Sequence, residues 1–526
     1  MKQLLLSALA FITAHIYFAQ NTNFLIIIAD DLGVDVFNGY HSGTLMPTTP
    51  TLDSMRSEGI TFENVWSAPS CTPTRASIMS AKYGVKTGVL KAPGNLDLVH
   101  QSLFTNLENY TNDAYEGAVV GKWHISQPVD YTHPSQHNVD HYNGVFQSAV
   151  PDYSNWTHTY QGIDVNDTNY VTSVLTDSAS TWINNQTKPW VMWLAHVAPH
   201  SPNHVPPAHM HTLTATGTPF RKYLAMIESL DYEINRLFQS IDPAKLANTT
   251  IIFIGDNGGT DLFIQDYPSS HAKGTVYQGG IRVPMIVCGA GVTRQGEREP
   301  ALLHVSDIHA SIIEMAGQDL PGGLYNSLSF DHLLTGSAGA TRDYVYSEID
   351  DDSPNTAWAI RGERYKLIQF EDSLQEFYDL QDDSLEFFNL IDSLTPAQEI
   401  IRADLEAEGL QTRAAWSCRD HIQNGDEEDI DCGGTYCPAC NTGINGINKN
   451  SLKVFPNPAS ELFYIQLEDA SGVIELTNIE GRVIRRMPVK STSMTIYTAD
   501  LENGVYLINY SNDNIRTSKR IIVSKN

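Results

Sequence analysis

The sequence predicts an α/β fold, in which helices cover a mainly parallel sheet, and two observations support this class. Apolar runs with the length of buried strands occupy residues 24–29, 118–121, 190–195 and 250–255. The segments between the runs are long enough for helices, and residues 223–238 carry apolar side chains at helical spacing. Strands that alternate with helices form parallel sheets, whose ligands bind beyond the carboxyl ends of the strands.

Each of the four runs is followed by residues with chemically useful side chains. Because the carboxyl ends of parallel strands lie at the same edge of a sheet, we expect these side chains to share one pocket. They are Asp30, Asp31, Lys122, His124, His200, Asp256 and Asn257.

The two acidic pairs predict a metal site. Two buried carboxylates about 4 Å apart, as expected for Asp30 and Asp31, repel each other by roughly 4 kcal/mol at an effective dielectric constant near 20, so positive charge must offset them. Asp256 and Asn257 add a carboxylate and an amide oxygen, a hard-oxygen set suited to Ca²⁺ or Mg²⁺ rather than Zn²⁺. Either pair alone is equally compatible with a cap on the following helix, but the two together favour a metal.

Residues 71–75 read Cys-Thr-Pro-Thr-Arg and form the most specific segment of the chain. Their plain interpretation is a loop cysteine near the start of a helix. A thiolate nucleophile needs a nearby base and is unfavourable beside a cation and several carboxylates. The segment resembles the Cys-x-Pro-x-Arg motif of the sulfatase family, which directs oxidation of its cysteine to formylglycine before folding.

The resemblance to the sulfatases extends from about residue 23 to about residue 390. Five more segments match motifs of the family in the correct order, and they are Asp30-Asp31, Gly121-Lys122-Trp123-His124, Pro199-His200-Ser201-Pro202, Asp256-Asn257 and the segment 273–284 beginning at Lys273. The resemblance implies an alkaline-phosphatase-like core and a smaller antiparallel C-terminal subdomain, with strands expected within residues 357–380. Three positions depart from the family: Thr74 stands where Ser is common, Ala81 replaces a usual Gly, and Gln278 replaces a usual Glu.

The resemblance also implies a mechanism. Hydrated formylglycine at position 71 presents a geminal diol, and the cation with Arg75 favours an alkoxide that attacks sulfur and releases the substrate alcohol. The two lysines of the matched motifs neutralise sulfate oxygens. His200, assisted by Lys273, is the candidate acid for the leaving oxygen, and His124 is the candidate base for the second hydroxyl, whose deprotonation expels sulfate.

The candidate residues therefore form two sets. The catalytic set is Cys71, Arg75, Lys122, His124, His200 and Lys273, and the metal set is Asp30, Asp31, Cys71, Asp256 and Asn257, for Ca²⁺ in preference to Mg²⁺. Read singly, a histidine in an apolar strand is more often structural, and a lysine is usually a solvated surface charge. In combination the motifs favour catalysis. We also expect His271, Trp123 and Tyr277 on the substrate side, and Cys288 as a buried strand thiol.

The charge balance argues against a nucleic-acid partner. The chain has 61 acidic and 33 basic residues and a net charge of −28, which leaves no broad basic face for a phosphate backbone. Residues 448–526 are slightly basic, and this contrast marks a domain boundary.

The first twenty residues read as a secretory signal peptide, with Lys2 followed by a mostly apolar run. A retained membrane anchor is the alternative, although the run is shorter than a span needs. Four cysteines, Cys418, Cys432, Cys437 and Cys440, lie close together and in an exported chain predict two disulfides. Zinc on these cysteines, or calcium on the acidic residues 426–431, is the competing interpretation.

The C-terminal segment has alternating strands, expected for example at residues 462–467 and 473–477, and resembles the sorting domain of bacterial type IX secretion substrates. A carbohydrate-binding or adhesion β-sandwich is the alternative. We therefore expect five segments: a signal peptide (1–20), a catalytic core (21–340), an antiparallel subdomain (341–412), a Cys-rich module with linker (413–447) and an all-β sorting domain (448–526).

These observations predict a secreted sulfuric ester hydrolase, extracellular or attached to the outer-membrane surface, that acts on an external sulfated glycan. Its expected partners are that substrate, a formylglycine-generating enzyme and the type IX secretion machinery. A phosphonate monoester or phosphodiester hydrolase of the same superfamily, or a non-catalytic glycan-binding relative, remains as an alternative. The sequence indicates neither the sugar nor the oligomeric state.

Overall fold

The computed structural model describes residues 22–417 and 452–525, apart from positions 41–42, 215–216, 321, 352, 458, 468–470, 479–481, 502 and 512–515. The chain divides into two compact units, residues 1–425 and 426–526. The expected signal peptide, the four clustered cysteines and the acidic residues 426–431 lie outside the described residues. Within the described part of the chain, no helix combines the length and the apolar character that a membrane span requires.

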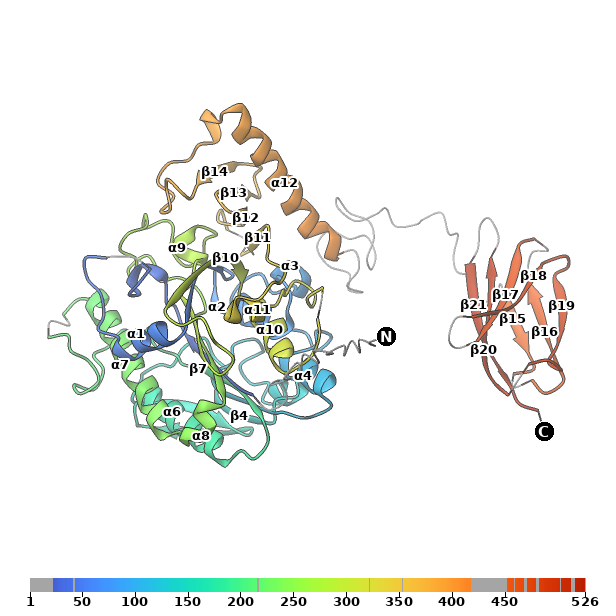
Figure 1. The fold of residues 1–526 in the computed structure, drawn as a ribbon, viewed down its shortest axis with the longest axis horizontal. Helices are drawn as coiled ribbons and strands as arrows, with labels where there is room; N and C mark the ends of the chain where they lie inside the picture. The colour runs from blue at the N-terminus through green and yellow to red at the C-terminus, as the bar shows by residue number, and fades with distance from the viewer. Residues whose placement is uncertain are drawn as a thin grey trace, which may run out of the picture. The chain divides into compact units, whose positions relative to one another are not determined.

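The larger unit is built on a ten-stranded sheet with the strand order β10-β2-β9-β8-β1-β7-β3-β4-β5-β6 (Figure 1). The strands are β1 (Asn23–Ala29), β2 (Ile60–Trp66), β3 (Glu116–Lys122), β4 (His141–Val145), β5 (Trp156–Tyr160), β6 (Ile163–Asp167), β7 (Trp190–Ala195), β8 (Thr249–Gly255), β9 (Met285–Gly289) and β10 (Glu297–His304).

The four apolar runs of the sequence are neighbours in this sheet. They form β8, β1, β7 and β3, which pair in that order and all run parallel. Both faces of these strands are covered, so nearly every residue in them is apolar and the runs are continuous instead of alternating. The prediction of a mainly parallel α/β sheet is confirmed, and the four carboxyl ends meet at one edge.

Alternate residues of each central strand enter two separate cores. Leu25 and Ile27 of β1 face one core, whereas Phe24, Ile26 and Ile28 face the other. Helices α1 (Pro50–Glu58), α6 (Val171–Asn185) and α7 (Pro219–Ser240) supply the first core, and α2 (Cys71–Ser80), α4 (Leu103–Thr111) and α10 (Asp307–Met315) supply the second.

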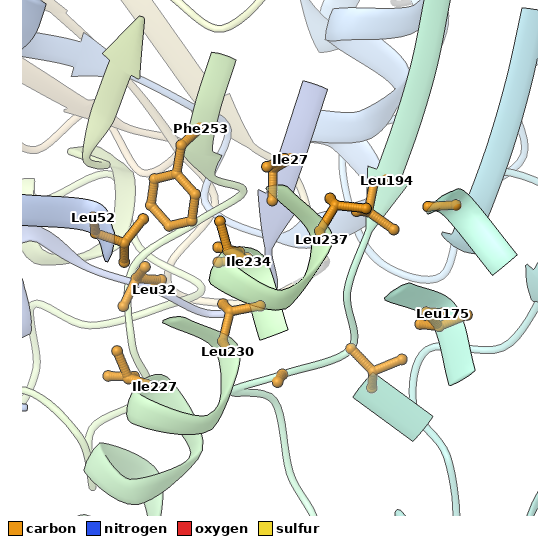
Figure 2. Packing of buried hydrophobic residues seen from close by; sticks show 14 of the residues in the cluster. Ile27, Leu32, Leu52, Leu175, Leu194, Ile227, Leu230, Ile234, Leu237 and Phe253 are labelled. Atoms are coloured by element: carbon orange, nitrogen blue, oxygen red, sulfur yellow. The ribbon is translucent and has the colours of Figure 1, made fainter. Parts of the chain in front are cut away.

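Helix α7 is the covering helix predicted at residues 223–238. It begins after Thr218, whose hydroxyl accepts a hydrogen bond from the backbone N–H of Arg221. Figure 2 shows its apolar side chains, Leu230 and Ile234 among them, packed beneath Ile27. Burial of each such side chain contributes roughly 1.5–3 kcal/mol to the free energy of folding, so α7 is held firmly against one face of the sheet.

Short helical turns complete this unit. They are η1 (Val34–Val36), α3 (Gly84–Thr87), α5 (His133–Gln136), α8 (Pro243–Ala247), α9 (Gln278–Ile281), α11 (Asp331–Thr335) and η2 (Ile391–Ser393). Ala81 caps the end of helix α2 and has the left-handed φ of 62° that a glycine adopts without steric cost. The replacement of the family's usual Gly therefore falls on a backbone position that favours glycine.

The expected antiparallel subdomain is confirmed. It is a sheet of β11 (Val345–Ile349), β12 (Ala357–Arg361), β13 (Tyr365–Phe370) and β14 (Gln375–Asp379) in sequential order, followed by α12 (Pro396–Ser417). One face packs Ala359 and Ile368 against Trp66 and Val276 of the core, and the other packs around Leu405 of α12.

The smaller unit consists of two antiparallel sheets around their own apolar core. Its strands are β15 (Leu452–Phe455), β16 (Leu462–Leu467), β17 (Val473–Asn478), β18 (Val483–Pro488), β19 (Ser493–Tyr497), β20 (Gly504–Ser511) and β21 (Arg516–Val523). The prediction of a separate all-β C-terminal domain is thereby confirmed.

Candidate active site

The predicted site residues converge at the carboxyl edge of the four central strands. Asp30 and Asp31 follow β1, Lys122 ends β3, and Asp256 follows β8. Cys71 is the first residue of α2, so the backbone N–H groups and the positive end of this buried ten-residue helix are at position 71. The structure thus starts a helix at a residue expected to lie in a loop.

Asp31 has an unusual backbone conformation that other residues support. Its φ is 66°, in the left-handed region that costs an aspartate about 1 kcal/mol or more. Its N–H donates to Asp256 Oδ1 at 3.0 Å, and the hydroxyl of Tyr223 on α7 donates to its carbonyl at 2.6 Å. Helix α7 therefore helps to fix the first acidic pair.

Asp30 is fully buried and surrounded by cations. Lys122 Nζ lies 2.6 Å from its Oδ2, and the guanidinium of Arg75 lies 3.9 Å from the same oxygen. Burial acts to raise the pKa of Asp30, but the charges of Lys122, His200 and Arg75 outweigh it and hold this pKa well below its usual range. The carboxylate of Asp30 is therefore ionised at neutral pH.

Arg75 connects the Cys71 motif to the second acidic residue. Its Nε and Nη2 both donate to Asp256 Oδ2, at 3.1 and 2.8 Å, and its Nη1 donates to the carbonyl of Lys122 at 2.8 Å. Burial and the nearby charge of Asp30 raise the pKa of Asp256 to about 6, although Arg75 opposes this. An arginine at this position holds the carboxylate and the end of β3 together.

Two buried oxygens in the pocket have no hydrogen-bond donor among the described residues: Asp30 Oδ1 and Asn257 Oδ1. The amide of Asn257 is oriented by its Nδ2, which donates to Asp31 Oδ1 at 2.8 Å, so its Oδ1 points elsewhere. Asp30, Asp31 and His200 each offer a ligand atom within 4.8 Å of the others. Unpartnered buried oxygens are costly unless a cation binds them, so these residues fit a hard divalent ion such as Ca²⁺.

Asp256 and Cys71, the remaining members of the expected metal set, have other contacts in this structure. Asp256 Oδ1 accepts one hydrogen bond, from the N–H of Asp31, and keeps a second lone pair, whereas Oδ2 accepts two hydrogen bonds from Arg75. Cys71 Sγ lies 3.2 Å from His124 Nδ1, as does the hydroxyl of Thr72. Position 71 thus lies against the candidate base.

The electrostatics distinguish Cys71 from His124. Burial raises the pKa of the Cys71 thiol, against the opposing charges of Lys122 and Lys273, so a thiolate is disfavoured there. Burial, then Lys122 and Arg75, lowers the pKa of His124 to about 2. The imidazole of His124 is therefore neutral, and burial and the neighbouring cations disfavour its protonated form. Its φ of 53° is also left-handed, a strain often found at functional sites.

Lys273 and His200 are the partly exposed side chains of this site. Their side chains are 18% and 14% exposed, whereas those of Arg75 and Lys122 are fully buried. Lys273 Nζ forms an ion pair with Asp31 Oδ1, and Asp31 raises the pKa of this lysine even though burial acts to lower it. His200 Nε2 lies 3.7 Å from Asp31 Oδ2.

The formal charges in the pocket balance. The structure brings three carboxylates together with Arg75, Lys122 and Lys273, and the carboxylates are those of Asp30, Asp31 and Asp256. A bound divalent cation would leave the pocket with a local charge of about +2. Such a pocket attracts an anion despite the strongly negative charge of the whole chain.

Several neighbours differ from expectation or were not predicted. Trp123 is only 1% exposed and its indole N–H donates to His133, so it belongs to the core and does not face a substrate. Tyr277 is partly exposed and stacks on His271 with ring centroids 3.6 Å apart. Thr72 lies inside the Cys71 motif, yet its contact with His124 has no sequence signal of its own.

The fold and this site define an α/β protein with a candidate site for a divalent cation. The chain belongs to the sulfatase family, because the family model described as Sulfatase matches residues 22–318, more than half of its length. A model of the C-terminal part of N-sulphoglucosamine sulphohydrolase matches residues 269–414. The model described as Secretion system C-terminal sorting domain matches residues 453–524, which indicates secretion to the extracellular space or the cell surface.

Individual relatives support this assignment. Arylsulfatase J of Mus musculus is 27% identical over 317 residues, which cover 56% of this chain and 52% of the mouse protein. This chain therefore spans about half the length of that relative. Two solved structures share the fold. Ps i-CgsB in complex with k-i-k-neocarrahexaose superimposes with a TM-score of 0.64 at 21% sequence identity, over 77% of this chain and 94% of the other. BT4656 in complex with its substrate D-glucosamine-2-N,6-O-disulfate superimposes with a TM-score of 0.60 at 18% identity, over 77% of this chain and 100% of the other.

Proposed function

We propose that this protein is a secreted sulfatase that removes sulfate from an external sulfated glycan or oligosaccharide. One observation carries the proposal. Cys71, at the start of a buried helix, converges with three carboxylates and three positively charged side chains, and two buried oxygens there, Asp30 Oδ1 and Asn257 Oδ1, have no hydrogen-bond partner among the described residues. When present, a divalent cation supplies positive charge for sulfate oxygens, and a formylglycine at position 71 supplies the attacking oxygen.

The buried residues of the site stabilise charge on the sulfate and remove a proton from the group at position 71. Arg75 and Lys122 have no solvent exposure, so their charges are weakly screened and are available to sulfate oxygens as charge shifts in the transition state. His124 Nδ1 lies 3.2 Å from the Cys71 sulfur, and this distance supports His124 as the base that removes a proton from the group at position 71 when sulfate is expelled.

The open side receives the leaving group. His200 and Lys273 are the charged or titratable residues at the solvent-exposed side, where the alcohol part of the substrate must lie if its sulfate reaches the buried cations. His200 protonates the leaving oxygen, and Lys273 donates to it or to the nearest sulfate oxygen. The backbone carbonyl of His200 accepts from the Tyr153 hydroxyl at 2.7 Å, which steadies this loop.

Secretion supports an external glycan as the substrate. The sorting domain indicates an extracellular or surface-attached protein. In addition, two solved structures similar to this chain contain an oligosaccharide or a sulfated sugar. We include in the proposal Ca²⁺ as the resident ion, maturation by a formylglycine-generating enzyme and export by type IX machinery. The five segments 1–20, 21–340, 341–412, 413–447 and 448–526 are the proposed domain boundaries.

Release of inorganic sulfate from a panel of defined sulfated oligosaccharides tests the proposal, with phosphate monoesters, phosphodiesters and phosphonates assayed in parallel on the same matured preparation. Mass spectrometry of the peptide that contains Cys71 reports its conversion. Cys71→Ala should abolish turnover, whereas Cys288→Ala, which removes the other described buried thiol, should retain it. Preferential hydrolysis of phosphorus esters would favour the related hydrolase, and a retained thiol without turnover would favour a binding protein.

A further inference from the structure

Three consecutive residues after the active-site lysine are held by three charged residues of the C-terminal subdomain. Lys366 Nζ on β13 donates to the carbonyl of Val276 at 2.7 Å. The hydroxyl of Tyr277 donates to Glu376 Oε2 at 2.7 Å, and the backbone N–H of Gln278 donates to Glu386 Oε2 at 2.6 Å. We call Lys366, Glu376 and Glu386 the clamp.

The centre of the clamp is an ion pair that is fully buried. Lys366 and Glu386 contact each other, and neither side chain is exposed to solvent. The ammonium of Lys366 also lies 5.1 Å from the centre of the Trp66 ring. Burial of such a pair is expensive and gives little net stability compared with apolar side chains of similar size, so a buried pair often serves to fix a geometry.

The residues that the clamp holds are joined to Lys273 by a tight turn. Gly274, with a φ of 85°, makes this turn possible. The N–H of Lys273 donates to the carbonyl of Gly259, and the N–H of Gly274 donates to the carbonyl of Pro69, two residues before Cys71. The loop is therefore attached to the core at residues 273–274 and to the clamp at residues 276–278, which leaves the Lys273 backbone little freedom.

The charge of position 278 fits this arrangement. Gln278 is buried, and its side-chain oxygen accepts from the indole N–H of Trp66 at 3.1 Å. Since Glu386 already neutralises Lys366, a neutral amide at position 278 completes the network without a second buried negative charge. The departure from the family's usual Glu at this position is consistent with the clamp in this chain.

We propose that Lys366, Glu376 and Glu386 are positioning residues that set the location of Lys273 against Asp31, so that the C-terminal subdomain contributes to turnover without touching the substrate. This inference rests on the proposed function and extends it to residues that lie about ninety or more positions after Lys273. The clamp acts through Lys273, and its removal lowers kcat while substrate binding changes little.

The test variant is Lys366→Met combined with Glu386→Gln in the full, matured chain. Met fills the space of the lysine, and Gln keeps an oxygen for the Gln278 N–H, so no unpaired charge is buried. We expect kcat for 4-nitrophenyl sulfate to fall at least tenfold and KM to change less than threefold. In a Lys273→Ala background the same double change should lower kcat less than twofold, because the clamp acts through the Lys273 side chain and that side chain is already removed.

Amide hydrogen exchange gives a second readout that does not depend on turnover. Exchange at residues 273–278 should be at least tenfold faster in the double variant, with β1 and β8 unchanged. If the unaltered protein released sulfate neither from 4-nitrophenyl sulfate nor from any member of the oligosaccharide panel, the proposed function would fail. The exchange measurement alone would then still decide whether the clamp orders this loop. Tyr277→Phe, which deletes one hydroxyl, gives a milder version of both results if the double variant fails to fold.

Arg364→Met is the matched control, because Arg364 pairs with Asp379 in the same subdomain and none of its hydrogen bonds reaches residues 271–278 among the described contacts. It should leave kcat and the loop exchange unchanged. The inference is overturned if the double variant folds with kcat within twofold of the parent, if the full loss persists in the Lys273→Ala background, or if loop exchange does not change.

Discussion

Replacement of Lys122 by methionine should strengthen binding of the divalent ion while it destroys turnover. Lys122 Nζ lies 2.6 Å from Asp30 Oδ2 and Arg75 lies 3.9 Å away, so at an effective dielectric constant near 20 the two attractions are about 6 and about 4 kcal/mol. The variant removes the larger attraction. Asp30 then becomes a buried carboxylate with one distant partner.

Lys122→Met should lower the stability of the ion-free protein more than that of the ion-loaded protein. Without an ion, removal of one partner from a buried pair should destabilise the fold by about 3–5 kcal/mol. With Ca²⁺ a part of this loss, about 1.4 kcal/mol, should be recovered, because the ion no longer competes with an ammonium for Asp30. We expect the dissociation constant for Ca²⁺ to fall roughly tenfold, equivalent to about 1.4 kcal/mol.

Calorimetric titration with Ca²⁺, thermal unfolding with and without the ion, and sulfate release at saturating Ca²⁺ measure these effects. We expect kcat to fall by about 10²–10³, as for loss of one preorganised charge at a transition state. Lys188→Met is the control. Lys188 forms an exposed ion pair with Glu116, which lies on β3 with Lys122, so this variant should leave Ca²⁺ binding, stability and kcat unchanged. Weaker Ca²⁺ binding in the Lys122 variant, or unchanged turnover, would refute the reasoning.

Three further predictions follow from the same geometry. Asn257→Leu removes an unpartnered buried oxygen and should weaken Ca²⁺ binding at least tenfold by calorimetry, whereas Asn257→Asp should retain it. Tyr223→Phe removes the donor to the Asp31 carbonyl and should cost about 1 kcal/mol of stability; an unchanged melting temperature and unchanged Ca²⁺ affinity would mean that Asp31 does not need this support. His196 is fully buried, neither ring nitrogen has a partner among the described residues, and burial followed by Arg236 lowers its pKa to about 3. Because this pKa is lower in the folded state than the usual 6.5, the stability it contributes is present above pH 6.5 and is lost as pH falls toward 3, by about 1.4 kcal/mol per unit. His196→Leu should therefore reduce the loss of melting temperature between pH 7.5 and 5, and an equal loss in both proteins would contradict this.

The sequence predicts the strands and the chemistry at their ends because both are local properties. Residues 24–29 and 250–255 are almost entirely apolar because they are buried on both faces of the sheet, and Asp30 and Asp256 interrupt these runs abruptly. The strand order is not local. That β1 lies between β8 and β7 depends on pairing between segments more than 150 residues apart, which no periodicity records.

The features of the site that the sequence does not predict are those that depend on tertiary contacts. Asp31 and His124 both adopt left-handed backbone conformations, and no pattern in the sequence around them predicts this. Lys366 reads in sequence as an ordinary strand lysine, which is normally a solvated charge. Its burial against Glu386 and Val276 becomes visible only when the two subdomains are packed together.

Removal of the divalent ion from correctly matured protein is the most direct test of the proposed site. The protein is dialysed against a chelator, its metal content is measured, and sulfate release is followed before and after Ca²⁺ is returned. We expect one ion per chain in the active preparation, a loss of at least a hundredfold in turnover without it, and recovery when Ca²⁺ is added. Full turnover by an ion-free preparation with a converted Cys71 would contradict the convergence of these residues on a single cation.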